Sequence, residues 1–140
     1  MTTLWLRIAS VISLLFTVGH TMGGLQRWSP TGDNDVLRQM TAVHFDVMGA
    51  NRSYADFYMG FGWSLSVAMV LQTVLLWQVA SLARRNASGV RPMIAVFALT
   101  TLASTVIAWR FIFLVPALFS TALLIPLVVA YVAAAPGRST

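Results

Sequence analysis

No charged side chain interrupts residues 57–83, FYMGFGWSLSVAMVLQTVLLWQVASLA, in the middle of this 140-residue chain. A helix needs about 20 apolar residues to cross roughly 30 Å of hydrocarbon, so this run is long enough to span a membrane. Lipid offers the backbone no hydrogen-bond partners, and the run lacks the strict alternation of a barrel strand. We therefore predict a transmembrane helix near 54–82.

Similar uncharged runs lie on both sides of this segment: residues 8–26, 92–109 and 111–137. Over the whole chain 58% of the residues are hydrophobic and 9% are charged, whereas soluble domains carry about 25% charged residues. We predict an all-α fold, an integral membrane four-helix bundle that forms a single domain over residues 1–140. The other three helices are expected near 3–23, 91–109 and 112–134.

The first segment shares one feature with a secretory signal peptide, because a single Arg7 precedes an apolar stretch near the N-terminus. No small-x-small cleavage site follows that stretch. We therefore expect the segment to be retained as a helix of the mature protein.

The arginines predict the orientation of the helices. The connection 24–56 holds three Arg and four Asp, whereas the short 82–92 loop holds Arg84, Arg85 and Arg91 and no acidic residue. In a four-helix chain, Arg7 and Arg138 lie on the same side as that loop. By the positive-inside rule, both termini are expected in the cytoplasm and the acidic connection outside.

The composition excludes several classes of function. The chain has no Cys, so disulfides, thiolate metal sites and cysteine catalysis are excluded. The net charge of +5 comes from arginines spread over helix ends, so nucleic-acid binding is not expected. The sequence contains no Ser-His-Asp elbow, phosphate loop or dinucleotide fingerprint. Nothing points to catalysis, and we expect a protein that is not an enzyme.

The outer connection 24–53 and the helix start that follows it hold every carboxylate of the chain. Residues 28–33, WSPTGD, are typical of a turn. Apolar residues at 36, 40, 43, 47 and 48 predict a short amphipathic surface helix over 36–48, ended by Gly49. Ser53 and Asp56 have the spacing of a helix-capping pair, so the second spanning helix is expected to begin there.

Polar and small residues form stripes within the predicted helices. The stripes comprise Ser10, Ser13, Thr17 and His20 on the first helix, Asp56, Gly60 and Ser64 on the second, and Thr100, Thr101, Ser104 and Thr105 on the third. Lipid penalises polar surface, so these faces are expected to look into the bundle. Gly60 and Gly62 also predict a close neighbour, which is a helix, a lipid tail or a flat cofactor. Trp28 and Trp109 are expected in an aromatic belt at the outer interface.

The candidates for a binding site at the outer face are His20, His44, Asp56 and Arg110. His20 ends the first helix, Asp56 begins the second, and Arg110 lies in the turn between the third and fourth. A carboxylate at a helix mouth needs a partner, and His20 and Arg110 are the first candidates, with Arg52 as a third. A contact among them would either tie the helix ends together or form a ligand-binding or proton-handling site.

Metal or haem ligation is an alternative role for the histidines. With Asp46 and Asp56 they supply nitrogen and oxygen ligands, and paired histidines hold haem in some helical bundles. However, the spacing matches no metal motif such as H-E-x-x-H, and His44 is expected on the surface helix. No metal site is predicted, and the identity of any cofactor stays open.

Two motifs resemble those of a known family. Gly19-His20-Thr21 ends the first helix, and residues 52–62, RSYADFYMGFG, begin the second. Together they resemble a family of small four-helix bacterial membrane proteins with no assigned function. The resemblance covers the first two helices and the connection between them. It implies the fold and a bacterial inner-membrane location, and it supplies no activity, cofactor or partner.

Two functions remain open. The first is a non-enzymatic accessory or assembly subunit that packs against a larger membrane complex, such as a respiratory or photosynthetic one, since the exterior is apolar and the soluble mass is small. The second is a protein that binds a quinone, a lipid head group or haem at the outer mouth around His20, Asp56 and Arg110. Membrane lipids and other membrane-protein subunits are the expected partners. Transport is disfavoured, because no ionisable residue lies near mid-membrane.

Overall fold

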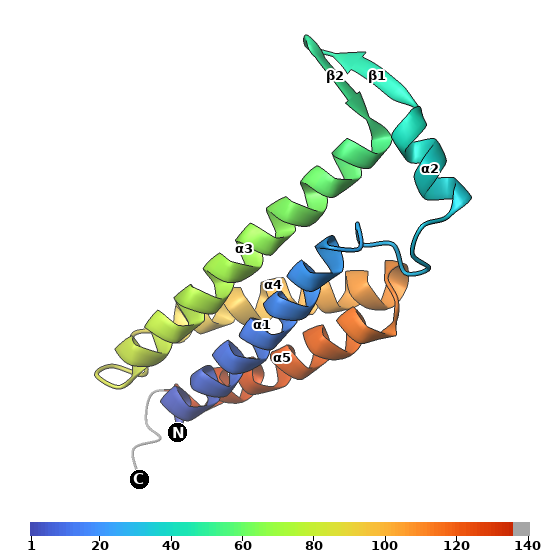
Figure 1. Ribbon diagram of the computed structural model, residues 1–140. Coiled ribbons are helices and arrows are strands. Elements are labelled where there is room, and N and C mark those ends of the chain that lie inside the picture. Colours follow the sequence, from blue (N-terminus) through green and yellow to red (C-terminus); the bar gives the residue numbers. More distant parts are fainter. Residues whose placement is uncertain (136–140) are drawn as a thin grey trace. The chain divides into compact units, whose positions relative to one another are not determined.

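The computed structural model describes residues 1–135, so Arg138 lies outside the described residues. Within this range the chain is mostly helical, and four of its five helices are long and apolar enough to cross a membrane (Figure 1). They are α1 (Thr2–Gly24), α3 (Tyr54–Ala83), α4 (Arg91–Phe111) and α5 (Leu114–Ala133). The chain is a multi-pass membrane protein, and the predicted number of spanning helices is confirmed.

Two compact units make up the chain. The described part of unit 1 comprises residues 1–16 and 70–135, and unit 2 comprises residues 17–69. The long helices α1 and α3 each contribute residues to both units, whereas α4 and α5 belong to unit 1 alone.

Unit 1 has one apolar core, to which all four long helices contribute. Its most deeply buried side chains are Leu6 and Ala9 of α1, Leu76 and Ala80 of α3, Ile94 of α4, and Leu127 and Ala130 of α5. The many alanines let the helix backbones approach closely, as helix contacts in membranes require. Only Ile112 and Phe113, both extended, join α4 to α5, so these two helices run antiparallel side by side (Figure 1).

The predicted inward face of α1 is confirmed within unit 1. Ser10 and Ser13 are buried, and Ser13 Oγ lies 2.8 Å from Thr73 Oγ1 of α3. On α4 the prediction is half correct. Thr101 and Thr105 are buried, but Thr100 and Ser104 are exposed.

The prediction of which face of α3 packs inside the protein is wrong. Asp56, Gly60 and Ser64 are exposed. The buried side chains of α3 belong to other positions, among them Ser66 and Leu76. Apolar residues occur all round this helix, so hydropathy does not distinguish its packed face from its outer face.

The connection between α1 and α3 differs from the single surface helix predicted over 36–48. Helix α2 covers only Asp35–Ala42, and β1 (His44–Val47) and β2 (Ala50–Ser53) form an antiparallel hairpin after it. Asn34 caps α2, its side chain accepting a hydrogen bond from the backbone N–H of Leu37.

A tight turn explains why the predicted helix gives way to a hairpin. Met48 (φ 51°) and Gly49 (φ 80°) both have positive φ, as in the type I′ turn that suits the twist of paired strands. The expectation that Gly49 ends a helix rested on the same preference of glycine for positive φ. The alternation of Phe45 and Val47 with polar neighbours was the overlooked signal for a strand.

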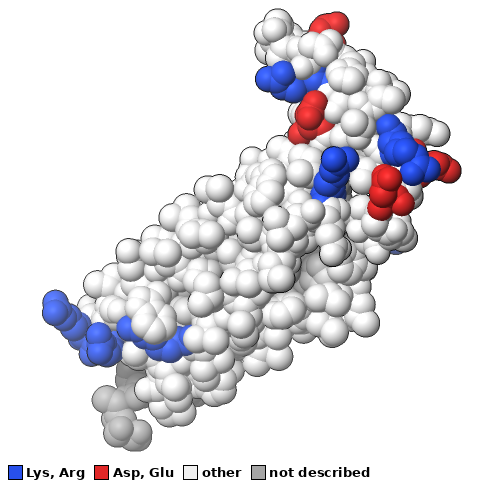
Figure 2. All heavy atoms as spheres, viewed as in Figure 1, with Lys and Arg blue, Asp and Glu red and all other residues white. Residues whose placement is uncertain are grey.

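Charged residues lie near the ends of the spanning helices and in the connection between α1 and α3. Figure 2 shows basic side chains gathered at one end of unit 1. One end of unit 1 carries Arg7, Arg84, Arg85 and Arg91. All four Asp belong to unit 2.

Candidate functional site

Within unit 2, the indole of Trp28 is held on several sides. Its Nε1–H donates a hydrogen bond to the carbonyl of His20 at 2.9 Å. The ring centroid lies 5.4 Å from that of His20 and 5.1 Å from that of Trp63, which it meets edge to face. The hydroxyl of Tyr58 donates to the carbonyl of Trp28 at 3.1 Å. We call this group, completed by Gly62, the Trp28 clasp.

His20 joins the clasp through its side chain as well as its carbonyl. Its Nε2 lies 3.2 Å from the carbonyl oxygen of Gly62 in α3. A carbonyl only accepts, so this contact fixes the proton on Nε2. The ring of His20 therefore ties the end of α1 to the first turns of α3 within unit 2.

Three glycines make room for the indole. A Cβ on Gly62 would lie 2.4 Å from the Trp28 ring, one on Gly24 2.9 Å and one on Gly23 3.1 Å. The close neighbour predicted at the glycines of this helix is therefore present at Gly62, and it is the chain's own indole. At Gly60 nothing lies within 4 Å of such a Cβ.

A left-handed turn carries the chain from α1 into the clasp. The N–H of Trp28 donates to the carbonyl of Gly23, and that of Arg27 to Gly24, the pattern of a Schellman helix end. Glycine usually occupies the left-handed position of this motif, yet here Arg27 has φ 54° and Trp28 φ 48°. Backbone of this kind persists only where the surroundings hold it, and the clasp provides that support.

Asp56 has a local partner. Its Oδ2 accepts hydrogen bonds from the N–H and the hydroxyl of Ser53, each at 2.9 Å, and Ser53 Oγ accepts from the N–H of Asp56 at 3.1 Å. This reciprocal pair is a capping box, and the predicted start of the second spanning helix is confirmed. Within residues 17–69, no hydrogen bond or ion pair joins Asp56 to His20 or Arg52. Asp56 precedes Gly62 by six residues, about 9 Å along a helix.

The other two candidates also make local contacts. His44 begins β1 rather than lying on a surface helix, and its Nδ1 is 3.1 Å from the carbonyl oxygen of Ala42. Arg110 belongs to the last turn of α4 in unit 1, with its guanidinium carbon 6.0 Å from the Phe111 ring centroid. Among residues 1–135, no three His or Asp side chains are grouped so that they could hold a metal ion.

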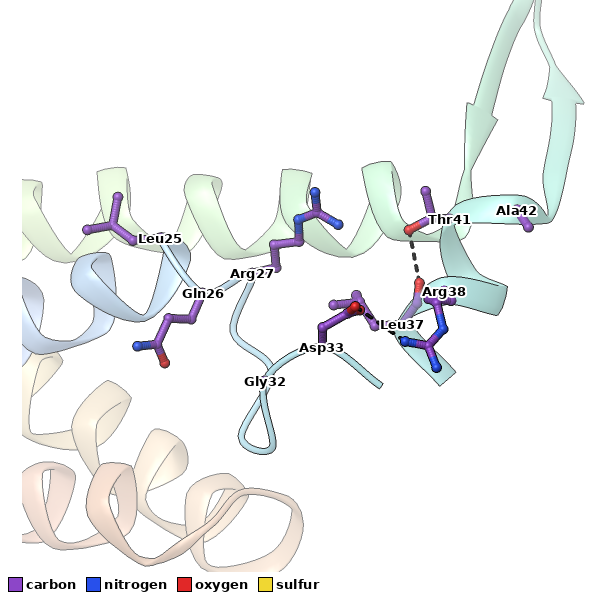
Figure 3. Close-up of a pocket in the computed structure, with 9 residues that line it drawn as sticks. All are labelled: Leu25, Gln26, Arg27, Gly32, Asp33, Leu37, Arg38, Thr41 and Ala42. Carbon is purple, nitrogen blue, oxygen red and sulfur yellow. Dashed lines mark hydrogen bonds and ion pairs between the residues drawn. The ribbon is translucent and has the colours of Figure 1, made fainter. Parts of the chain in front are cut away.

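An open cavity of about 620 Å³ lies in the connection between α1 and α3 (Figure 3). It is lined by Leu25, Gln26, Arg27, Gly32, Asp33, Leu37, Arg38, Thr41 and Ala42. Arg38 pairs with Asp33 at 3.3 Å and with Asp35, and all three side chains are exposed. The cavity is open and carries its own ion pair, and none of the four candidate residues lines it.

The role of Trp28 in packing was not predicted from the sequence, which indicated only a place in an interfacial aromatic belt. The signal that could have identified it is the pair Gly23-Gly24 at a helix end, followed closely by a large aromatic residue. Pairing with Gly62 is a long-range contact that no local pattern reveals.

Comparison with protein-family models, curated proteins and solved structures finds no match to this chain.

Proposed function

We propose that the chain is a non-enzymatic accessory subunit of a larger complex in the bacterial inner membrane. Its four spanning helices form a bundle with both termini in the cytoplasm, an orientation supported by the arginines of α1 and of the 84–91 segment. The polar groups of the outer mouth support a structural role, because His20 and Asp56 each have a partner close by.

The observation that carries this proposal is a face of small residues on α3. Gly60, Ser64 and Ala68 recur every four residues, and all three are exposed. This small-xxx-small spacing lets two transmembrane helices approach closely. Phe57 and Phe61 lie next to this face and are also exposed, at 56% and 65%. A helix from another subunit is the occupant that this surface fits best.

Site-specific photo-crosslinking in native membranes tests the proposal. A photoreactive phenylalanine analogue at Ser64 is expected to give one discrete product with a different membrane polypeptide. The same analogue at Leu118, exposed on α5, serves as the control and is expected not to give that product. A product of twice the chain's own mass would mean that α3 pairs with a second copy. That outcome, or the absence of any product, would contradict the accessory role.

Binding of a flat cofactor at the outer mouth is the second candidate function, and one observation favours it. The space between Gly24 and Gly62 accepts a flat ring beside His20. The indole of Trp28 fills that space, so a quinone or haem edge would have to displace it, which ranks this function second. Absorption spectra and solvent extracts of the purified wild type test it, with His20→Ala and Asp56→Ala as the variants expected to lose the ligand. A preparation without quinone or haem would exclude it.

A further inference from the structure

We propose that unit 1 binds the head group of an anionic phospholipid where α3 ends. Arg84 and Arg85 hold the phosphate, and Arg7 supports them from α1. The inference concerns a different unit and a different ligand from the proposed function, and it does not depend on it.

The place of these residues in the fold brings them to lipid head groups. α3 ends at Ala83 and α4 begins at Arg91, so the segment 84–90 joins two spanning helices and lies at a membrane face. An open cavity of about 430 Å³ lies there, lined by Ser81, Leu82, Arg84 and Arg85. Its wall combines two guanidinium groups with an apolar side chain, which suits the junction between a head group and an acyl chain.

The charge of unit 1 is unbalanced. All four carboxylates of the chain lie between Asp33 and Asp56, so none belongs to unit 1. In the described part of the chain, neither Arg84 nor Arg85 takes part in an ion pair, and both are exposed. Within the described part of unit 1, no side-chain carboxylate balances these two charges. Guanidinium groups bind phosphate through paired hydrogen bonds, and basic segments beside spanning helices attract anionic lipids.

Arg7 adds a third positive charge beside this cavity. Its guanidinium lies 3.4 Å from the ring centroid of Trp77, and its Nη2 donates a hydrogen bond to Ser81 Oγ at 2.9 Å. Ser81 in turn lines the cavity. The other amino group, Nη1, is buried and has no hydrogen-bond partner within residues 1–135. The stacking on Trp77 holds this charge beside Ser81, which lines the cavity.

Arg91 differs from Arg84 and Arg85 because its guanidinium group has a partner within unit 1. Its Nε donates to the carbonyl of Tyr131 at 3.4 Å, and its guanidinium lies 4.2 Å from the ring centroid of that residue. Arg91 is therefore used to join α4 to α5 within unit 1, whereas Arg84 and Arg85 remain available for an external phosphate.

Native mass spectrometry of the full chain in mild detergent tests the assignment. The probes are phosphatidylglycerol and phosphatidylethanolamine with identical acyl chains. The wild type is expected to retain phosphatidylglycerol in preference. The double variant Arg84→Gln/Arg85→Gln removes two charges and is expected to weaken retention roughly 30-fold. The matched variant Arg38→Gln/Arg52→Gln removes two charges in unit 2 and is expected to retain the lipid as the wild type does.

A second double variant separates the effect of charge from that of paired hydrogen bonds. The variant Arg84→Lys/Arg85→Lys keeps the charge but not the paired hydrogen bonds, so it should retain less phosphatidylglycerol than the wild type and more than the Gln variant. If the Gln variant fails to fold, the Lys variant decides the question by its preference for phosphatidylglycerol. Equal retention of both lipids by the wild type, equal loss in both Gln variants, or complete displacement by millimolar inorganic phosphate would overturn the assignment.

Discussion

Trp28 shows how a single residue can depend on backbone conformation, glycine packing and hydrogen bonds at once. Two left-handed residues in succession cost about 1–2 kcal/mol each. Against this stand the indole's hydrogen bond to His20 and its contacts with three glycines and Trp63. Trp28 is half-buried, and its packing and hydrogen bond offset this strain. The clasp is therefore expected to be rigid.

Gly62→Ala is the sharpest test of the clasp. The new methyl group would lie 2.4 Å from the Trp28 ring, so the indole must move. Overpacking of this kind costs about 1–3 kcal/mol, and we expect a lower Tm in detergent and a shift in tryptophan fluorescence. Gly60→Ala is the matched control on the same helix, because its Cβ meets nothing within 4 Å. Since Ala favours helix over Gly, that control should be neutral or stabilising, and equal effects at the two positions would refute the packing of the Trp28 ring against Gly62.

Arg27→Gly tests the strain at the end of α1. Arg27 has φ 54° at a position of the Schellman motif where glycine is the usual residue. Relief of the left-handed conformation is expected to stabilise the chain by about 1 kcal/mol, measured as a rise in Tm. Trp28→Gly relieves the same strain but removes the ring, so it should lower the Tm. A fall in Tm for Arg27→Gly would mean that the arginine side chain matters more than the turn.

Among the elements, α3 owes its first turn to the reciprocal pair of Ser53 and Asp56. Ser53→Ala removes the side chain that accepts from Asp56 N–H and donates to Asp56 Oδ2. Loss of such a cap costs about 0.5–2 kcal/mol, so we expect reduced thermal stability and faster hydrogen exchange in residues 54–57. Ser64→Ala, at an exposed position of the same helix, is the control and should change neither quantity.

The elements also show what could be predicted from the sequence. The spanning helices follow from uncharged length alone, and their bounds were predicted to within two residues of the structure. The hairpin of β1 and β2 was missed because Gly49 suits a helix end and a hairpin turn equally well. The packed face of α3 was missed because the helix is apolar all round. The hairpin had a local signal in the alternation around Phe45 and Val47, whereas the packed face of α3 depends on contacts with residues far along the chain.

In the candidate site too, some contacts could be predicted from the sequence and others could not. The capping role of Asp56 follows from its spacing to Ser53 and was predicted. The contact of His20 with Gly62 was not, since it joins residues 42 positions apart. Trp28 combines a local signal, the glycine pair before it, with a distant one in α3. A single sequence displays only the local signal.

For the molecule as a whole, the orientation in the membrane has a clean test because the chain contains no Cys. Asn51→Cys lies in β2 of the acidic connection, and Ser88→Cys lies in the arginine-rich segment between α3 and α4. The proposed orientation, with both termini in the cytoplasm, predicts that a membrane-impermeant maleimide applied from outside labels only the Asn51 variant. Ser88→Cys should react only after the membrane is permeabilised. The reverse pattern would invert the topology.

A role as an accessory subunit predicts a defined mass for the particle that carries this chain. Extraction from native membranes in a mild detergent, followed by native mass spectrometry, should give a particle that contains this chain and other polypeptides in a fixed ratio. Gly60→Leu/Ser64→Leu fills the small-residue face of α3 and should release the chain from that particle, whereas Val70→Leu, exposed further along the helix, should not. A particle composed only of this chain and lipid, unchanged by the variants, would contradict the accessory role.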